Sequence, residues 1–171
     1  QWAVSIAGAL ITVLFISVSV NTWHTSAEPM PSDAGFSDID TSPYKDAILF
    51  VQSEGIVEGY SDGTFRPDTE INRAEFTKIM VGGAYQEEIE TYQATSCFPD
   101  VNATDWFAKY VCLAKDHGVI GGYPDGTFQP GQTINVAESL KITMLAMFGN
   151  EIDDVSSGDW YQKYLDFANR Y

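Results

Sequence analysis

Basic residues are scarce in this chain, and their scarcity excludes two classes of partner. The 171 residues include 9 lysines and arginines against 24 aspartates and glutamates, which gives a net charge of −15. A chain with this charge repels polyanions, so we expect no nonspecific binding to nucleic acid or to anionic lipid headgroups. Binding of any polyanion would require a local exception.

Residues that bind metals or act as nucleophiles are also few. The chain has two cysteines and two histidines. A metal site at the cysteines would need more ligands, and His117 is the only histidine near them. No nucleophile with a base, and no pair of carboxylates in a cleft, remains once turns and helix caps are accounted for. We therefore expect no metal, no cofactor and no catalysis within these residues.

Long apolar runs are limited to one, at residues 2–20. This run carries no charge and is about as long as a bilayer core. Small residues at 25 and 27 suit signal-peptidase cleavage after Ala27. Residues 1–27 are therefore predicted to be a signal peptide or an uncleaved membrane anchor, followed by a linker at 28–35. Either reading indicates export to the cell surface or envelope, with membrane contact only through this run.

An internal repeat of about 63 residues organises the remainder. GIVEGYSDGTFRPDTEINRAE at 55–75 aligns without a gap on GVIGGYPDGTFQPGQTINVAE at 118–138. Upstream, FSDI matches FPDV, and DVSSGDWYQKYLDFA opens a third copy. The predicted copies are 36–96 with its linker, 97–149, and the truncated third copy 150–171.

The first half of each copy has the apolar spacing of a helix. Its residues are Tyr44, Ala47, Ile48 and Val51 in the first copy, with Phe107, Tyr110, Val111 and Ala114 and then Tyr161, Tyr164, Leu165 and Ala168 in the others. Ser42, Asp105 and Asp159 are the predicted N-caps of these helices. Gly55 and Gly118 are predicted to end the first two.

A second helix in each full copy is predicted to begin at an asparagine. Asn72 and Asn135 can each cap a helix, while Glu75 or Glu138 three residues later completes a capping box. We regard all four as candidate ligand contacts, with capping as the first role of the glutamates.

The loop between the two helices contains an Asp-Gly pair, at 62–63 and at 125–126, which predicts a tight turn between short extended segments. The turn accounts for the aspartates, so a calcium site is not indicated. The predicted fold is mainly α, with tandem helix-loop-helix repeats. Because one such unit cannot bury its apolar face alone, copies should pack together and leave grooves that suit a ligand.

These linked motifs resemble the S-layer homology domain family. The resemblance is carried by FSDI, GYSDGTFRP and INRAE in the first copy and by FPDV, GYPDGTFQP and INVAE in the second. It implies three repeats around a pseudo-threefold axis, as found in S-layer proteins, exoenzymes and outer-envelope proteins. It also implies noncovalent binding to a wall-attached polysaccharide, commonly one with pyruvate ketals, in grooves between repeats.

In that family the arginine of an ITRAE-like motif is a main ligand contact, and Arg73 occupies the matching position. Asn72 replaces the usual threonine, and Glu75 keeps the acidic place. The second copy has Val136 at the arginine position, which puts a charge-assisted contact there in doubt.

Arg73 is also notable on physical grounds, because the macrodipole at the first turn of a helix disfavours a cation by up to ~1 kcal/mol. Together with free backbone N–H groups, its guanidinium could hold a carboxylate or another anion. In that case Arg73→Ala weakens wall binding and hardly changes thermal unfolding. The alternative is an ion pair with an acidic neighbour, in which case the melting temperature falls.

Four aromatic residues occupy equivalent positions in pairs. Tyr60 and Tyr123 precede the turns and are candidates for stacking on sugar rings, although such aromatics are more often part of the core. Trp106 and Trp160 lie beside the predicted caps, and we expect them to pack between repeats rather than to contact sugar.

Cys97 and Cys112 are predicted to form a disulfide, the simplest state of two cysteines in an exported chain. The bridge would tie the FPDV segment to the following helix and contribute roughly 3 kcal/mol. The first copy has Gly35 and Leu49 at these positions, so both residues change together.

The sequence therefore predicts a non-catalytic envelope anchor that binds wall polysaccharide. Two alternatives remain open. The chain could be the anchoring part of an exported hydrolase whose catalytic domain lies outside these residues, or a helical protein-interaction module.

Overall fold

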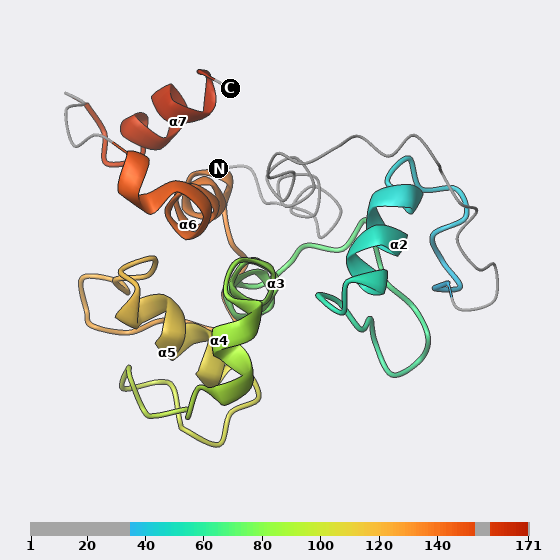
Figure 1. Cartoon of the computed structure of the whole chain (residues 1–171), viewed down its shortest axis with the longest axis horizontal. Helices are drawn as coiled ribbons and strands as arrows, with labels where there is room; N and C mark the ends of the chain where they lie inside the picture. The colour runs from blue at the N-terminus through green and yellow to red at the C-terminus, as the bar shows by residue number, and fades with distance from the viewer. Residues whose placement is uncertain (1–34, 153–157, 171) are drawn as a thin grey trace. The chain divides into compact units, whose positions relative to one another are not determined.

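The computed structural model describes residues 35–152 and 158–170 (Figure 1). The predicted leader at 1–27, and the linker at 28–35 apart from its last residue, lie outside the described residues. Within the described ranges, no helix combines the length and the apolar character needed to cross a membrane.

The described residues are mainly helical, which confirms the predicted fold class. The elements are α2 (Lys45–Ser53), α3 (Arg73–Ala84), α4 (Gln86–Thr91), α5 (Ala108–Asp116), α6 (Val136–Phe148), the short 3-10 helix η1 (Gly149–Glu151) and α7 (Gln162–Ala168). In these ranges the predicted extended segments pair only as isolated bridges, Asn72 with Thr133 and Phe98 with Val101.

The chain divides between Thr69 and Glu70 into two compact units. Helix α2 lies in the first unit, and the helices from α3 onwards lie in the second. The division falls inside the first sequence copy, whose second helix α3 packs with the helices of the second copy.

The predicted N-caps of the first helices are wrong. Helices α2, α5 and α7 each begin two residues later than predicted, and none has a side-chain cap. Each chain segment first makes a tight turn instead, in which the N–H of Lys45 donates to the carbonyl of Ser42 at 3.2 Å in the first copy. In the other two copies, the backbone carbonyls of Asp105 and Asp159 accept from the N–H groups three residues later. Because the carbonyls of residues 42, 105 and 159 accept hydrogen bonds in these turns, each α-helix begins later in the chain.

The glycine ends of these helices are confirmed. Gly55 has a φ of 70° and Gly118 a φ of 71°, a left-handed conformation that glycine adopts without a steric penalty. After Gly55, the N–H of Ile56 donates to the Val51 carbonyl at 3.0 Å, which closes the last turn of α2.

Both predicted capping boxes are also confirmed. The Asn72 side chain accepts from the N–H of Glu75 at 2.9 Å, and the Glu75 carboxylate accepts from the N–H of Asn72 at 3.1 Å. Asn135 and Glu138 repeat the pattern at 3.0 and 3.2 Å. Because all of these contacts are local, they follow directly from the N-x-x-E spacing.

Helix α3 lies at the centre of the second unit, in contact with α4, α5 and α6, while α7 packs on α6 (Figure 1). Its buried residues face more than one neighbour, and they include Phe76 and Met80, which are 1% and 0% exposed. Arg73 is the one charged residue of α3 among them. Two of the helices that cover α3, namely α5 and α6, belong to the second copy.

The predicted disulfide between Cys97 and Cys112 is present, with an S–S distance of 2.01 Å. It joins the segment before Phe98 to the buried face of α5. In the first unit, a Cβ atom placed on Gly35 would lie 3.4 Å from Leu49. The two copies therefore place the same two positions close together, and the second copy joins them by a covalent bond.

Candidate ligand-binding pocket

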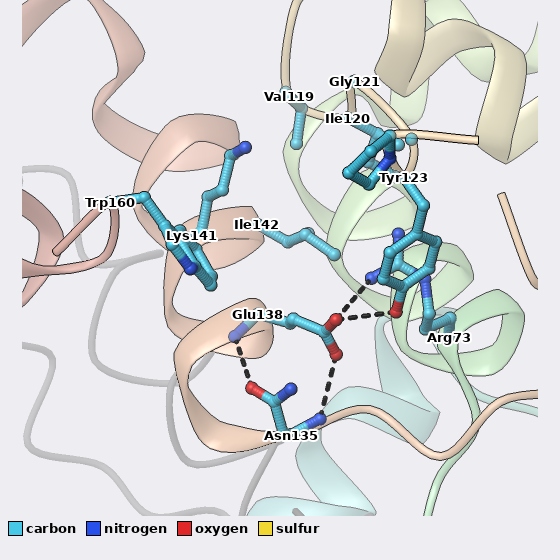
Figure 2. Close-up of a pocket in the computed structure, with 12 residues that line it drawn as sticks. Arg73, Val119, Ile120, Gly121, Tyr123, Asn135, Glu138, Lys141, Ile142 and Trp160 are labelled. Atoms are coloured by element: carbon cyan, nitrogen blue, oxygen red, sulfur yellow. Dashed lines mark hydrogen bonds and ion pairs between the residues drawn. The ribbon is translucent and has the colours of Figure 1, made fainter. Parts of the chain in front are cut away.

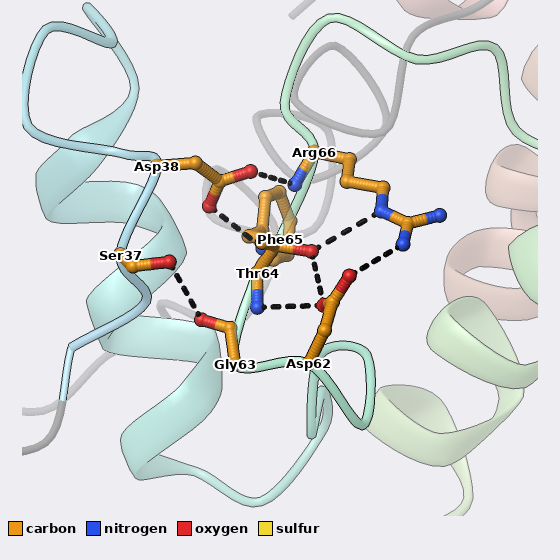
Figure 3. A network of polar contacts seen from close by, with 7 residues as sticks. All are labelled: Ser37, Asp38, Asp62, Gly63, Thr64, Phe65 and Arg66. Atoms are coloured by element: carbon orange, nitrogen blue, oxygen red, sulfur yellow. Dashed lines mark hydrogen bonds and ion pairs between the residues drawn. The ribbon is translucent and has the colours of Figure 1, made fainter.

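The Asp-Gly turn has the same hydrogen bonds in both copies. Asp62 accepts from the backbone N–H of Thr64 at 3.1 Å and from its hydroxyl at 2.6 Å (Figure 3). Asp125 accepts from Thr127 at 2.9 and 2.6 Å. The bonds from Thr64 and then from Arg66 lower the pKa of Asp62 to about 2. The predicted turn is thus confirmed, and its aspartates are occupied by the turn itself.

A second aspartate in each copy holds the end of this loop, and the sequence reasoning missed it. Asp38 accepts from the N–H groups of Phe65 and Arg66 at 2.8 and 2.7 Å (Figure 3). Asp100 accepts from those of Phe128 and Gln129 at the same distances. The available signal was the aspartate shared by FSDI and FPDV. We call each set of two bonds the aspartate clamp.

The clamp holds a strained backbone. Arg66 and Gln129 have φ values of 61° and 57°, in the left-handed region that side chains other than glycine rarely adopt. In the second copy the clamp also fixes Phe128, whose ring is fully buried. The clamp therefore holds the Phe128 carbonyl in a fixed position.

Arg73 contacts the Phe128 carbonyl. Its side chain is buried, and its Nε donates to the Phe128 carbonyl at 2.9 Å. One terminal nitrogen lies 3.7 Å from the Glu138 carboxylate. The guanidinium lies over the rings of Tyr123 and Phe128, with centroid distances of 4.6 and 5.0 Å. These contacts therefore favour the interpretation in which Arg73 forms an ion pair with an acidic neighbour.

The expectation of free N–H groups beside Arg73 is wrong. The N–H of Arg73 donates to the Gln132 carbonyl at 2.9 Å, and that of Ala74 to the Pro130 carbonyl at 3.1 Å. The next N–H, of Glu75, is used by the capping box. The segment after Phe128 runs along the start of α3 and takes these donors, so they are not available to an anion.

A pocket of about 450 Å³ lies against Arg73 (Figure 2). All three sequence copies contribute to it, through α3, the loop at 119–124, α6 and the start of the third copy. The side chains that matter most for its chemistry are Arg73, Tyr123, Asn135, Glu138, Lys141 and Trp160.

Glu138 connects the residues at the base of the pocket (Figure 2). It accepts from the Tyr123 hydroxyl at 2.6 Å and completes the Asn135 capping box. Burial, followed by the bond to Glu138, raises the pKa of Tyr123 to about 12, although the charge of Arg73 opposes the rise. The phenol is therefore protonated at neutral pH and donates to Glu138, which also partly neutralises Arg73.

Lys141 and Trp160 form the opposite side of the pocket (Figure 2). Lys141 is half-buried, and no carboxylate among the described residues forms an ion pair with it. Burial lowers the pKa of Lys141, and the charges of Lys163 and Arg73 lower it further. The Trp160 ring, 54% exposed, lies 5.7 Å from the Lys141 ammonium. This side therefore presents a cation with no carboxylate partner among the described residues, beside an exposed aromatic ring.

Comparison with known families matches two segments of the chain to the S-layer homology domain, at 35–77 and 98–138. Both segments contain the aspartate clamp, the Asp-Gly turn and a capping box. The chain belongs to the S-layer homology domain family.

Similar proteins with S-layer homology segments include three with informative names. Cell surface glycoprotein 1 of Acetivibrio thermocellus is 31% identical over 71% of this chain and 6% of its own length. A cellulosome-anchoring protein of the same organism is 34% identical over 65% of this chain and 25% of its own. An amylopullulanase of Thermoanaerobacterium thermosulfurigenes is 33% identical over 75% of this chain and 7% of its own. The chain thus spans a small part of the relatives that it matches.

Among the predicted contacts, Arg73, Tyr123, Asn135 and Glu138 lie together at the pocket of this S-layer homology protein. Asn72 and Glu75 cap α3 but do not line the pocket. Tyr60 lies in the first unit, half-exposed, with the Arg66 guanidinium 4.1 Å from its ring centroid.

The two tryptophans are more exposed than the expected packing between repeats implies. Trp106 and Trp160 are 56% and 54% exposed, and each makes an edge-to-face contact with the next residue in the chain, Phe107 or Tyr161. Trp160 also lies beside Lys141 of the second copy. Val136, at the position of Arg73 in the second copy, is 47% exposed and does not line the pocket. Equivalent positions in the sequence copies therefore did not predict which of the two residues lines the pocket.

Proposed function

We propose that this chain is a non-catalytic envelope anchor that binds a wall-attached polysaccharide in the pocket beside Arg73, Lys141 and Trp160. The observation that carries the proposal is the pocket itself, which combines an exposed tryptophan, hydrogen-bonding groups and a lysine that forms no ion pair within the described part of the chain. Sugar recognition uses aromatic faces together with polar groups in this way. A charged ligand group of the opposite sign, such as a pyruvate ketal carboxylate, would suit it.

The relatives support the location of the protein. Their names describe a cell surface glycoprotein and a cellulosome-anchoring protein, and the part that they share with this chain is the S-layer homology segment. An exported protein of the cell envelope fits these matches. The leader at 1–27, the linker at 28–35 and the repeat boundaries 36–96, 97–149 and 150–171 remain part of this proposal.

Sedimentation with cell walls tests the proposal. The purified protein is mixed with walls of the bacterium that produces it, before and after chemical removal of the polymers attached to peptidoglycan. We expect the protein to sediment with the intact walls and to stay in solution with the stripped ones. Equal sedimentation with both, or with neither, contradicts polysaccharide binding.

The amylopullulanase relative favours a second proposal, in which the chain anchors a hydrolase. The complete reading frame tests it. A glycoside hydrolase domain in the same frame supports this proposal, and a frame without one contradicts it.

A further inference from the structure

The positive charge of Arg73 is already used within the protein. Its Nε is bound to a backbone carbonyl, and a carboxylate lies 3.7 Å from a terminal nitrogen. Its side chain is only 7% exposed. An anion that approached Arg73 would also approach Glu138, and the repulsion would offset much of the attraction. Arg73 is therefore poorly placed to be the principal anion contact.

Lys141 differs from Arg73 in each of these respects. It lines the same pocket, one turn after Glu138 on α6, but no described carboxylate pairs with it. Two further cations, Lys163 and Arg73, lie close enough to disfavour its charge. A ligand anion at Lys141 would be stabilised by its ammonium and would relieve the repulsion between Lys141 and these neighbouring cations.

We infer that Lys141 makes the principal contact with the anionic group of the ligand, and that Trp160 supports the adjoining sugar ring. This inference rests on the proposed polysaccharide function and specifies which residues recognise the acidic group. Arg73 is then a positioning residue that holds the loop at Phe128 and the carboxylate of Glu138.

The positions of the charges also set the orientation of the ligand. Glu138 and Asn135 lie at the base of the pocket, so hydroxyl and amide groups of the sugar can donate to the carboxylate there. The acidic substituent must point away from Glu138, toward Lys141 (Figure 2). The pocket therefore selects an acidic sugar over a neutral one and fixes which edge of the ring carries the acid.

Lys141→Met tests the contact while preserving most of the apolar stem of the side chain. Lys109→Met is the matched control, because it removes the same charge from α5 at a residue that does not line the pocket. Both variants and the unmodified protein are titrated with native walls and with walls whose carboxylates have been reduced to alcohols. Lys141→Arg, which keeps the charge, is the conservative variant.

We expect Lys141→Met to bind native walls about 10-fold more weakly or worse, the effect of losing one charge-assisted bond. On carboxyl-reduced walls, Lys141→Met and the unmodified protein should bind equally, because the partner of the lysine is gone. Lys109→Met should match the unmodified protein on both walls, and Lys141→Arg should retain most of the affinity. The thermal unfolding of Lys141→Met should not fall, because burial disfavours the charge that it removes.

The outcomes separate the inference from the proposed function. If the unmodified protein binds native walls and Lys141→Met binds them equally well, the inference is wrong and the anchoring function stands. If Lys141→Met loses affinity equally for native and reduced walls, a carboxylate is not the partner, and the inference is again wrong. If the unmodified protein fails to bind native walls, both proposals fail.

Discussion

A buried arginine that is bonded to a carbonyl and close to a carboxylate contributes first to stability. Arg73→Met leaves the Phe128 carbonyl without its donor and Glu138 without its counter-charge. We expect the free energy of unfolding to fall by about 2–4 kcal/mol, the range for breaking a buried charged contact. Calorimetry of the variant and the parent protein measures the change.

Arg66→Met provides the control for Arg73. Arg66 forms an exposed ion pair with Asp62 at 2.7 Å, and exposed pairs of this kind contribute about 0–1 kcal/mol. A loss at Arg73 no larger than the loss at Arg66 would contradict the structural role. The burial of Arg73 and its bond to Phe128 favour a loss of stability over the nearly unchanged unfolding that the sequence suggests for an Arg73 substitution.

Residues with local partners could be predicted from the sequence, and residues with distant partners could not. Asn72 and Asn135 were predicted correctly because each capping partner lies three residues away. The partner of Arg73 at Phe128 lies 55 residues away, and no spacing rule connects the two. For the same reason Lys141 passed unnoticed, since its importance depends on what surrounds it in the fold.

At the scale of elements, the aspartate clamp of the second copy holds the loop whose Phe128 carbonyl binds Arg73. Asp100→Asn leaves one oxygen to serve the two N–H groups of Phe128 and Gln129, and its amide N–H₂ cannot accept either. We expect a loss of about 1–3 kcal/mol and faster hydrogen exchange at both amides. Hydrogen exchange followed by NMR measures these amides individually.

Asp38→Asn is the matched variant in the first unit. It should speed the exchange of Phe65 and Arg66 and leave the amides at 128 and 129 unchanged. Because the clamp of the second copy holds the carbonyl that binds Arg73, only Asp100→Asn should also weaken wall binding. Unchanged exchange at Phe128 in Asp100→Asn would show that the loop does not depend on the clamp.

The disulfide joins two positions of the second copy that are glycine and leucine in the first copy. The double variant Cys97→Gly with Cys112→Leu installs the pair found at Gly35 and Leu49. We expect this variant to fold, with stability lower by up to roughly 3 kcal/mol. Thermal unfolding with and without a reducing agent should differ for the parent protein but not for the variant. A parent protein that is insensitive to complete reduction would contradict the contribution of the bridge.

The sequence predicted the two main helices of each full copy better than their starts, and it did not predict α4. The periodic spacing identifies α2, α5 and α7, but the turns before Lys45, Ala108 and Gln162 shift each start by two residues. Such turns compete with a helix by using the same carbonyls, and no residue type distinguishes the two outcomes. The central position of α3 depends on contacts between copies and was equally inaccessible.

At the scale of the whole molecule, the net charge of −15 opposes an acidic polymer, while the pocket attracts its acidic group. Salt screens the long-range repulsion between exposed charges more than a short, partly buried contact. We therefore expect wall binding to stay constant or to increase as NaCl rises from roughly 50 to 300 mM. Proteins that bind polyanions through many exposed cations lose several orders of magnitude in affinity over a comparable range. A loss of about 10-fold or more would indicate diffuse electrostatic binding instead of a pocket.

The central claim is that the wall polymer enters the pocket beside Trp160, and NMR of the tryptophan indole N–H groups tests it most directly. A soluble fragment of the wall polysaccharide is added to ¹⁵N-labelled protein, and the Trp160 signal is assigned with Trp160→Phe. We predict that the Trp160 indole signal shifts in proportion to the bound fraction, and that Lys141→Met weakens this response. A Trp160 signal that does not move while the protein becomes saturated with the polymer would contradict the account.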